Sequence, residues 1–270
     1  MTGWGRDGPF APLAGHDIDY IAVSGALSAF GMAGGPPVPP LNVVGDFGGG
    51  GLLLALGIVA ALFEVRSGGG GQVVDTAMVD GSALLMAPFY AAAQIGVWGP
   101  RGTNLLDTAA PYYGCYKCAD GAWVAVGALE PRFYAALLSG LALDPGGIPD
   151  REDRTRWPEL REVFAARFAS RNRDAWAEVF GPGGHDACVA PVLDLHEAPA
   201  HPHNVARATF AEVEGVRHPA PAPRLSGTPL RIARRPCYAG EHTDEALADW
   251  GIAADRIAAL KAAGAIAQHA

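Results

Sequence analysis

The sequence has no apolar run long enough to cross a bilayer as a helix. Its longest apolar stretch, Leu52–Phe63, has twelve residues, whereas a membrane-spanning helix needs about 20. We therefore expect a buried core helix there. The first residues, Met1–Arg6, lack the charged segment followed by an apolar segment that marks a secretory signal peptide. These absences favour a cytoplasmic protein without a membrane partner.

Basic residues are too few to give the chain a positive charge. Its formal net charge is −8 and its pI is about 5.4, which disfavours a nucleic acid or an anionic membrane as a partner. Only 18% of the residues are charged and 50% are hydrophobic, so the composition argues against disorder and predicts a sizeable core. Four cysteines are too few for a disulfide scaffold, which fits a reducing compartment.

Several common catalytic and binding motifs are missing. The glycines after Asp46 lack the Gly-Lys-Ser/Thr ending of a P-loop and the spacing of a dinucleotide fingerprint, and no Gly-x-Ser-x-Gly elbow occurs. Cys115 and Cys118 form a C-x-x-C pair, but a strand would point them to opposite faces. His201 and His203 lie in a proline-rich loop, where a surface position is expected. We therefore predict no metal site.

One stretch, Val43–Gly51, combines a carboxylate with four glycines in an apolar setting. Burying the charge of Asp46 there is costly unless the carboxylate is paired or hydrogen-bonded. Gly48, Gly49 and Gly50 would let backbone N–H groups approach a ligand, and a helix beginning after them would direct its positive end to the same place. The alternative is a solvated aspartate that caps a helix in a glycine-rich turn, and spacing alone favours it.

Hydrophobic spacing predicts a helical region followed by an α+β region. Helices are expected over 17–27, 52–63 and 77–94. The last two are broadly apolar, so other parts of the chain or a second subunit must cover them. Aromatic and β-branched runs flank Asp120-Gly121, which is typical of a type I′ hairpin turn. Further elements are expected as follows: helices over 132–141 after Pro131, 158–169, 173–180 after Asn172 and 243–263, and a strand over 188–193.

Three titratable residues remain as candidates for chemistry. His16 would lie at the start of the first helix, Asp46 precedes the glycines, and Glu130 precedes a proline that opens a helix. A histidine and carboxylates in different environments suit general acid–base catalysis. A single histidine more often has a surface or structural role, so the residues by themselves leave both interpretations open.

Five motifs, two of which contain His16 and Asp46, occur together: Gly15-His16-Asp17-Ile18-Asp19-Tyr20, the run from Pro39 to Gly50, Gly71-Gln72-Val73-Val74-Asp75, Asn104-Leu105-Leu106-Asp107 and Ala110-Pro111-Tyr112-Tyr113. An aspartate that follows Pro-Pro-Leu-Asn and precedes glycines, with a histidine upstream, is a specific combination. The chain resembles the class III CoA-transferase family (CaiB/BaiF type) over essentially its whole length. Within that family it is most similar to the α-methylacyl-CoA racemases.

The resemblance implies an α/β fold with a Rossmann-like large domain and a smaller α+β domain. Residues 1–105 would form the C-terminal, mostly helical part of the large CoA-binding domain, 106–225 the small domain, and 226–270 a return segment on the large domain. Family members carry about a hundred further residues before the position of Met1, the size of a small domain. The sequence therefore resembles a truncated gene, a protein with a wrongly assigned start, or one piece of a split protein. The family also forms an interlocked homodimer.

The resemblance also implies roles for individual residues. In the racemases, the residues matching His16 and Asp46 flank C2 of a 2-methylacyl-CoA thioester. One removes the α-proton and the other returns a proton to the opposite face, through an enolate. The glutamate matching Glu130 orients the histidine, and the asparagine matching Asn42 lies close to the aspartate. N–H groups of the glycines would stabilise the enolate oxygen. CoA is part of the substrate, and no cofactor is implied.

Two other functions stay open. In the CoA-transferases of the family, the aspartate matching Asp46 forms covalent anhydride and thioester intermediates while CoA moves between carboxylic acids, and the histidine is generally absent. The presence of His16 therefore favours proton transfer over acyl transfer. The third function is non-catalytic: a chain that is inactive alone and binds a partner supplying the missing part.

Overall fold

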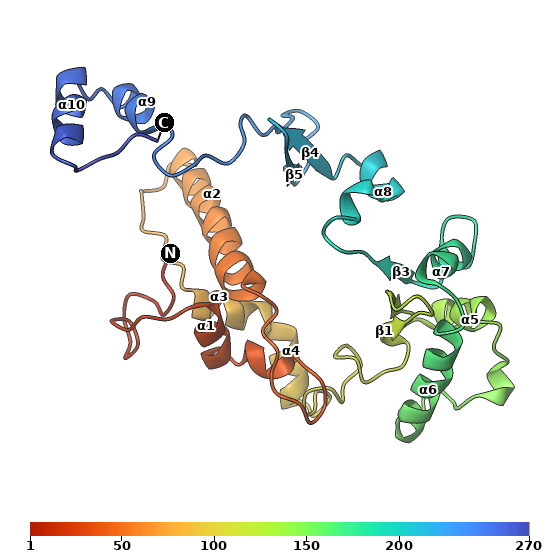
Figure 1. Ribbon diagram of the computed structural model, residues 1–270. Coiled ribbons are helices and arrows are strands. Elements are labelled where there is room, and N and C mark those ends of the chain that lie inside the picture. The colour runs from red at the N-terminus through yellow and green to blue at the C-terminus, as the bar shows by residue number, and fades with distance from the viewer. Residues whose placement is uncertain (270) are drawn as a thin grey trace. The chain divides into compact units, whose positions relative to one another are not determined.

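The computed structural model describes residues 1–269, which fall into two compact units, 1–192 and 193–269 (Figure 1). Helices and strands are both present, as the predicted α/β class requires. The boundary after Val192 does not coincide with the boundaries of the three predicted segments. The assignment of those segments to a large and a small domain stays a prediction.

Helices make up the first part of the first unit. They are α1 (Asp17–Val23), the 3₁₀ turn η1 (Ala26–Ala29), the π-helix η2 (Val43–Leu52), α2 (Leu53–Arg66), α3 (Met78–Leu85) and α4 (Ala87–Gln94). α3 packs against both η2 and α1. A small core forms where Ile21, Ala26 and Met86 are buried together. The helix that begins after His16 and the helix that contains Asp46 are therefore held by a common neighbour.

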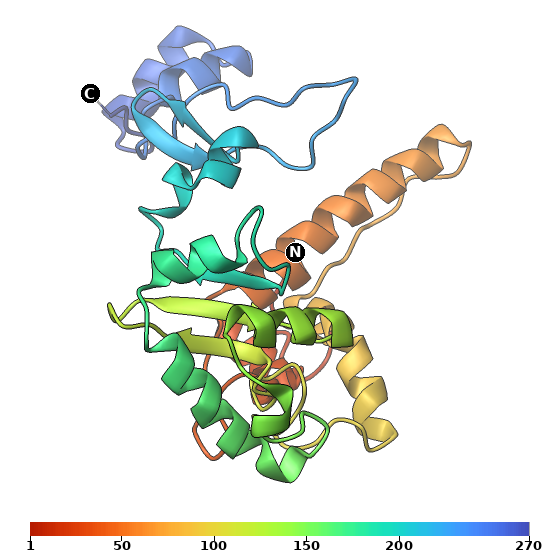
Figure 2. The same ribbon diagram turned by 90° about the vertical axis from the view of Figure 1, so that its right-hand side faces the viewer.

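The apolar helix α2 is not buried within residues 1–269, so the prediction of a buried core helix is wrong for this part of the chain. None of its side chains is buried, and Phe63 is 72% exposed. Figure 2 shows the returning segment, residues 67–76, beside it, where Val74 lies against Gly57. By length and composition alone, the continuous helix Val43–Arg66 could cross a membrane. Cover of this helix by another segment or a second subunit, which its composition predicts, stays a prediction.

A three-stranded antiparallel sheet and three helices form the other part of the first unit. The strands, in the order β1-β2-β3, are β1 (Tyr113–Lys117), β2 (Trp123–Gly127) and β3 (Val189–Val192). The helices are α5 (Pro131–Gly140), α6 (Trp157–Phe168) and α7 (Arg173–Phe180), with 3₁₀ turns η3 (Pro145–Gly147) and η4 (Arg154–Arg156). α6 packs on β1, and α7 packs on β2 and β3. The predicted hairpin, third strand and three helices are confirmed close to their expected bounds.

The core of this α+β part is aromatic. Trp176, Phe164 and Phe168 are fully buried. The ring of Phe168 lies 5.3 Å from that of Trp176 and 5.1 Å from that of Tyr116. The indole N–H of Trp176 donates to the carbonyl of Phe168 at 2.8 Å, so burial leaves no unpaired donor there. Each such side chain contributes about 1.5–3 kcal/mol by leaving water.

Two elements differ from prediction because of the backbone at single residues. The predicted helix over 77–94 is broken at Met86, where ψ is 3°, and α4 begins with Pro88 in its first turn, a position that tolerates proline. The hairpin turn is not type I′, because only Gly121 of the central dipeptide has a positive φ. Instead, the Gly121 N–H donates to Cys118 at 3.0 Å and the Cys118 N–H donates to Ala122 at 2.8 Å. The turn is therefore longer than two residues.

The second unit consists of a hairpin and short helices. They are η5 (Ala198–Ala200), α8 (Pro202–Ala206), β4 (Phe210–Val213), β5 (Val216–Pro219), α9 (Thr243–Asp249) and α10 (Ala254–Ala262). The single helix predicted over 243–263 is wrong, since Gly251, with φ of 80°, separates α9 from α10. The hairpin formed by β4 and β5 was not predicted. In its turn, Glu214 and Gly215 both have positive φ. An X-Gly pair between two short apolar runs is the signal that could have identified it.

We expect the α+β core to lose stability at alkaline pH. Burial raises the pKa of Tyr134 to about 12, and it raises the pKa of Tyr116 further still. The unfolded chain, whose tyrosines titrate near pH 10, then loses these protons before the folded chain does. The stabilising contribution is therefore complete below about pH 10 and is lost as the pH rises through about 12. Urea unfolding at increasing pH checks this, and a Tyr116→Phe variant should lose less stability across the same range. A free energy of unfolding that stays constant up to about pH 12 would contradict the expectation.

Candidate active site

His16 lies exposed at the start of α1, as predicted. Its backbone N–H donates to the carboxylate of Asp19 at 2.9 Å, which satisfies a donor just outside the helix. The hydroxyl of Tyr20 donates to the carbonyl of Gly15, the residue before the histidine. Two side chains from the first turn of α1 therefore hold the backbone on both sides of His16 and leave its side chain exposed.

Asp46 lies in the first turn of η2 and is half-buried. The side-chain amide of Asn42 donates to Asp46 Oδ2 at 3.0 Å. The carboxylate is therefore hydrogen-bonded, as its apolar setting requires, and Asn42 lies beside it as the resemblance implies. The positive end of the helix favours a carboxylate in this turn. Segments of π-helix are rare and recur at functional sites.

His16 and Asp46 line one pocket, with a volume of about 430 Å³. Its other lining residues are Met1, Gly15, Tyr20, Phe47, Gly51 and Met78. The fold thus brings together the two candidates that the sequence places on separate segments. A histidine and a carboxylate at one cavity can act as acid and base on the same bound carbon. Their individual roles stay a prediction.

Tyr20 is a pocket residue that the sequence did not single out. Its ring packs edge-on against Trp4, with centroids 4.8 Å apart. Burial, and after it the charges of Asp19 and Asp46, raise the pKa of the Tyr20 hydroxyl. Within α1, Tyr20 is buried whereas the apolar residue Ile18 is 46% exposed. An aromatic residue four positions after the histidine could have indicated this inner face.

The glycines after Asp46 lie inside η2, so the prediction of a glycine turn that precedes a helix start is wrong. In a π-helix each N–H bonds the carbonyl five residues earlier. The oxyanion role predicted for Gly48, Gly49 and Gly50 stays a prediction and would compete with these bonds. The structure shows a different use of glycine. A Cβ on Gly81 would lie 1.9 Å from the Gly49 carbonyl oxygen, so η2 and α3 touch backbone to backbone.

Glu130 is the N-cap residue of α5 and precedes Pro131, as predicted. Its side chain is exposed, and within residues 1–269 no hydrogen bond or ion pair joins it to His16. The pKa of the Cys188 thiol is raised, first by burial, then by the charge of Asp186 and then by the charge of Glu130. The structure therefore brings His16 and Asp46 together but not Glu130. The pairing of Glu130 with His16 stays a prediction.

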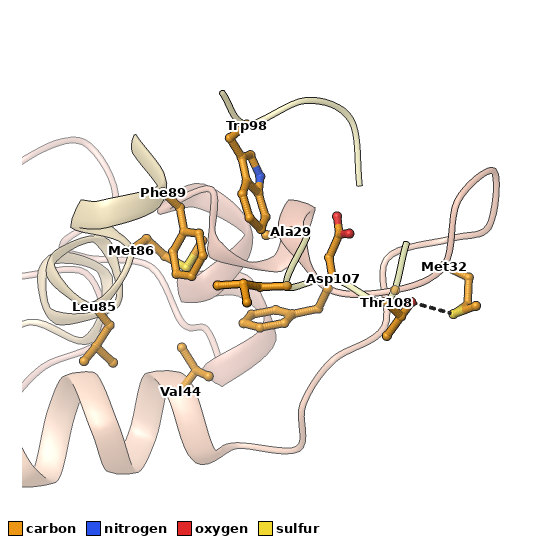
Figure 3. Close-up of a pocket in the computed structure, with 12 residues that line it drawn as sticks. Ala29, Met32, Val44, Leu85, Met86, Phe89, Trp98, Asp107 and Thr108 are labelled. Carbon is orange, nitrogen blue, oxygen red and sulfur yellow. Dashed lines mark hydrogen bonds between the residues drawn. The ribbon is translucent and has the colours of Figure 1, made fainter. Parts of the chain in front are cut away.

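A second pocket, with a volume of about 450 Å³, is almost wholly apolar (Figure 3). Phe89 and Trp98 form part of its wall, with ring centroids 4.8 Å apart, and Val44 of η2 forms another part. Its one carboxylate, that of Asp107, accepts hydrogen bonds from the backbone and the side chain of Asn104 at 2.7 and 2.6 Å. Since that carboxylate is already engaged, this pocket suits an apolar group and not proton transfer.

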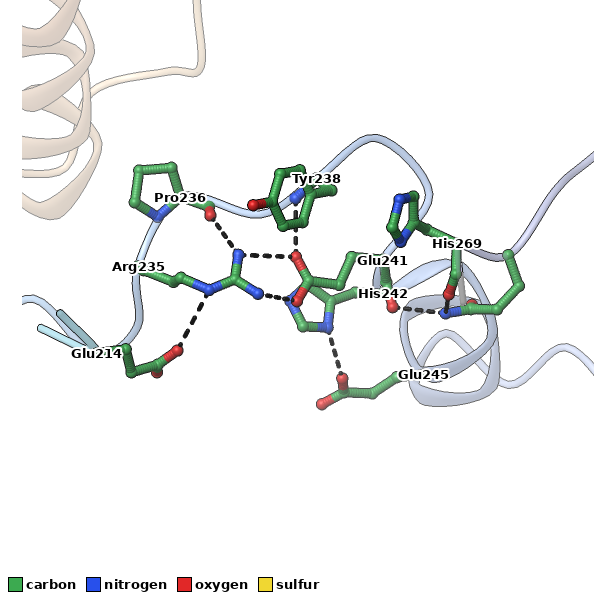
Figure 4. Close-up of polar contacts among 9 residues, drawn as sticks. Glu214, Arg235, Pro236, Tyr238, Glu241, His242, Glu245 and His269 are labelled. Atoms are coloured by element: carbon green, nitrogen blue, oxygen red, sulfur yellow. Dashed lines mark hydrogen bonds and ion pairs between the residues drawn. The ribbon is translucent and has the colours of Figure 1, made fainter. Parts of the chain in front are cut away.

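The second unit contains a polar cluster centred on Arg235 (Figure 4). Its guanidinium pairs with Glu241 at 2.6 Å and with Glu214 at 3.6 Å. The backbone N–H of Tyr238, and then Arg235, hold the pKa of the Glu241 carboxyl below its usual range. Because two carboxylates already neutralise Arg235, this cluster is not a ready binding site for the phosphates of CoA.

The thiols and imidazoles do not form a metal centre in the part of the chain that the structure describes. Within residues 1–269, no three side chains of His, Cys, Asp or Glu gather as metal ligands would. Cys115 is exposed and Cys118 is buried, which agrees with the prediction that they point apart.

Comparisons of the sequence with known proteins agree with one another. A family model described as CoA-transferase family III matches residues 1–243. The chain is 47% identical to alpha-methylacyl-CoA racemase of Mus musculus, over 96% of this chain and 68% of that protein. It is 43% identical to alpha-methylacyl-CoA racemase of Homo sapiens, over 95% of this chain and 68% of that protein.

The fold of the chain also matches that of a solved structure. The crystal structure of a CAIB/BAIF family protein from Brucella suis matches with a TM-score of 0.72 and 21% identity, and the match covers 92% of this chain and 66% of that one. At this identity the likeness shows the fold alone. The chain thus spans about two thirds of the length of the proteins that it matches.

Proposed function

This chain belongs to CoA-transferase family III, a family of enzymes, and we propose that it interconverts the two configurations at C2 of 2-methylacyl-CoA thioesters. The observation that carries the proposal is the shared pocket of His16 and Asp46. The two racemases, at 43–47% identity, support the same reaction. The proposed substrate is an acyl-CoA, and a cytoplasmic location fits the composition.

The proposed reaction is a proton transfer in two steps. One of the two residues, His16 or Asp46, takes the C2 proton, and the electron pair moves onto the thioester oxygen to form an enolate. The other residue then delivers a proton to C2 on the opposite face. Substrate and product have the same composition, so there is no net oxidation or reduction, and the thioester carbonyl itself accepts the electron pair. Asn42, which donates to the Asp46 carboxylate at 3.0 Å, would hold this base in position.

We further propose that the working form is a homodimer. Two observations support it: α2 has no buried side chain within residues 1–269, and Glu130 is exposed without a contact to His16. A second copy would cover apolar surface and could supply the glutamate from outside the chain that holds the histidine. The molecular mass in solution tests this, and a monomer that is fully active would contradict it.

Exchange of the C2 proton in heavy water tests the function. With one pure configuration of a 2-methylacyl-CoA, we expect deuterium to enter at C2 and the other configuration to accumulate. Circular dichroism should first show that the chain is folded. A folded chain that gives neither exchange nor a mixture of configurations contradicts the proposal.

The same samples distinguish the alternatives. If the chain is instead a CoA-transferase, hydroxylamine added during turnover with a carboxylic-acid acceptor should attack the anhydride or thioester of Asp46, release the carboxylate or CoA, and leave a hydroxamate on Asp46, with no deuterium at C2. If the chain needs a partner, exchange should appear only after a polypeptide equivalent to the N-terminal part of the relatives is added.

A further inference from the structure

Asp17, which follows His16 directly, is a buried carboxylate that the proposed proton transfer does not use. Its side chain is 6% exposed. Its Oδ1 atom accepts the backbone N–H of Asp46 at 2.7 Å, across 29 positions of sequence. One side chain on the helix that starts at His16 therefore holds the backbone of the other proposed base.

The contact is closely fitted. A Cβ added at Gly45 would lie 2.4 Å from Asp17 Oδ1 and 2.9 Å from its Cγ. Glycine at position 45 therefore lets the carboxylate reach the first turn of η2. The N–H groups of a first turn lack partners within the helix, and the helix dipole favours a negative charge beside them. Asp17 satisfies one of these N–H groups, that of Asp46.

The burial of Asp17 also has a cost. Its second oxygen, Oδ2, is buried and has no hydrogen-bond partner within residues 1–269. A buried polar atom without a partner is unfavourable, so stability alone does not account for a carboxylate here. Positioning of the neighbouring bases does account for it, because a shift of about 1 Å in a reacting group can lower a rate by about 10²-fold.

We propose that Asp17 is a positioning residue that sets the separation of His16 and Asp46. This inference rests on the proposed function of that pair. Asp17 holds the Asp46 backbone, and Asn42 holds the Asp46 side chain. Because Asp17 is bonded directly to His16, the same contact also fixes the position of the His16 backbone relative to Asp46. Asp17 itself is not among the residues that line the shared pocket of His16 and Asp46.

The test compares Asp17→Ala, Asp17→Asn and a matched control, Asp7→Ala, at an exposed position of the N-terminal loop. Two quantities are measured on the 270-residue chain: hydrogen exchange at the Asp46 amide, and kcat and KM for C2 exchange of a 2-methylacyl-CoA. For Asp17→Ala we expect loss of protection at the Asp46 amide and a fall in kcat of about 10²-fold, with KM nearly unchanged. Asp17→Asn retains an acceptor oxygen, so both quantities should stay within about threefold of the wild type.

Several outcomes would overturn the inference. The inference is wrong if Asp17→Ala folds and keeps a normal kcat, or if only its KM changes. It is also wrong if the Asp46 amide of Asp17→Ala keeps its protection from hydrogen exchange. If Asp17→Ala does not fold, Asp17→Asn decides: a large loss of kcat with a protected amide would show that charge and not position matters. A wild-type chain without C2 exchange contradicts the proposed function instead, while the amide measurement still decides whether Asp17 holds Asp46.

Discussion

His16→Asn and Asp46→Asn are each expected to lower the rate of racemisation by about 10²–10⁴-fold, the usual contribution of a general acid or base. Each variant should nevertheless keep one half of the chemistry, because the base that remains can still remove the C2 proton from the configuration that faces it. Incubation of each pure configuration in heavy water should therefore show exchange in only one of them. The configuration that exchanges should be opposite in the two variants.

Matched substitutions outside the pocket serve as controls for this result. Asp7→Asn and His203→Asn make the same chemical changes at exposed positions and should leave racemisation within about twofold of the wild type. If both active-site variants exchange the same configuration, one residue performs both proton transfers. If neither substitution changes the rate, the two residues are not the bases.

Gly81→Ala is expected to destabilise the first unit although it adds a single methyl group. Helix propensity alone would favour alanine at this position by about 1 kcal/mol. The new Cβ, however, would lie 1.9 Å from the carbonyl oxygen of Gly49 and 2.5 Å from its carbonyl carbon. Both are backbone atoms that cannot rotate away, so α3 and η2 must separate. We expect a loss near the upper end of about 1–3 kcal/mol and a lower exchange rate, because η2 carries Asp46.

Gly70→Ala is the control, because a Cβ there would have no neighbour within 4 Å. Urea unfolding should place this control within about 0.5 kcal/mol of the wild type. The opposite sign, with Gly81→Ala more stable than the wild type, would show that propensity outweighs the close approach and that the two helices can separate at little cost.

Local patterns predicted the elements of the α+β part well. The proline after Glu130, the glycine after Asp120 and the β-branched run that contains Val124 are short-range signals, and β1, β2 and α5 follow them closely. Those signals were less reliable where one residue interrupts a periodic run. Met86 and Gly251 each divide a predicted helix in two, because hydrophobic spacing does not report a local change of ψ or φ.

For the candidate site, the sequence predicted that His16 and Asp46 belong together but not the contacts that hold them. The motifs around His16 and Asp46 identified the pair and the family. Tyr20 and Asp17 were not identified, because their importance depends on Gly15 and on the Asp46 backbone, which they reach only in the folded chain. The hydrogen bond between Asp17 and Asp46 joins residues 29 positions apart, and it does not alter the residue pattern of either segment.

The glycine run beside Asp46 shows where the sequence and the tertiary structure divide. By itself the sequence predicted that a carboxylate in an apolar setting needs a hydrogen-bond partner, and its resemblance to the racemases made His16 the candidate that favours proton transfer. Only the tertiary structure decided what the glycines do: they lie within a π-helix whose backbone touches that of α3. The physical reason is that glycine permits both a turn and a close approach of two backbones. The partner helix α3, whose Gly81 follows Gly49 by 32 positions, selects between them.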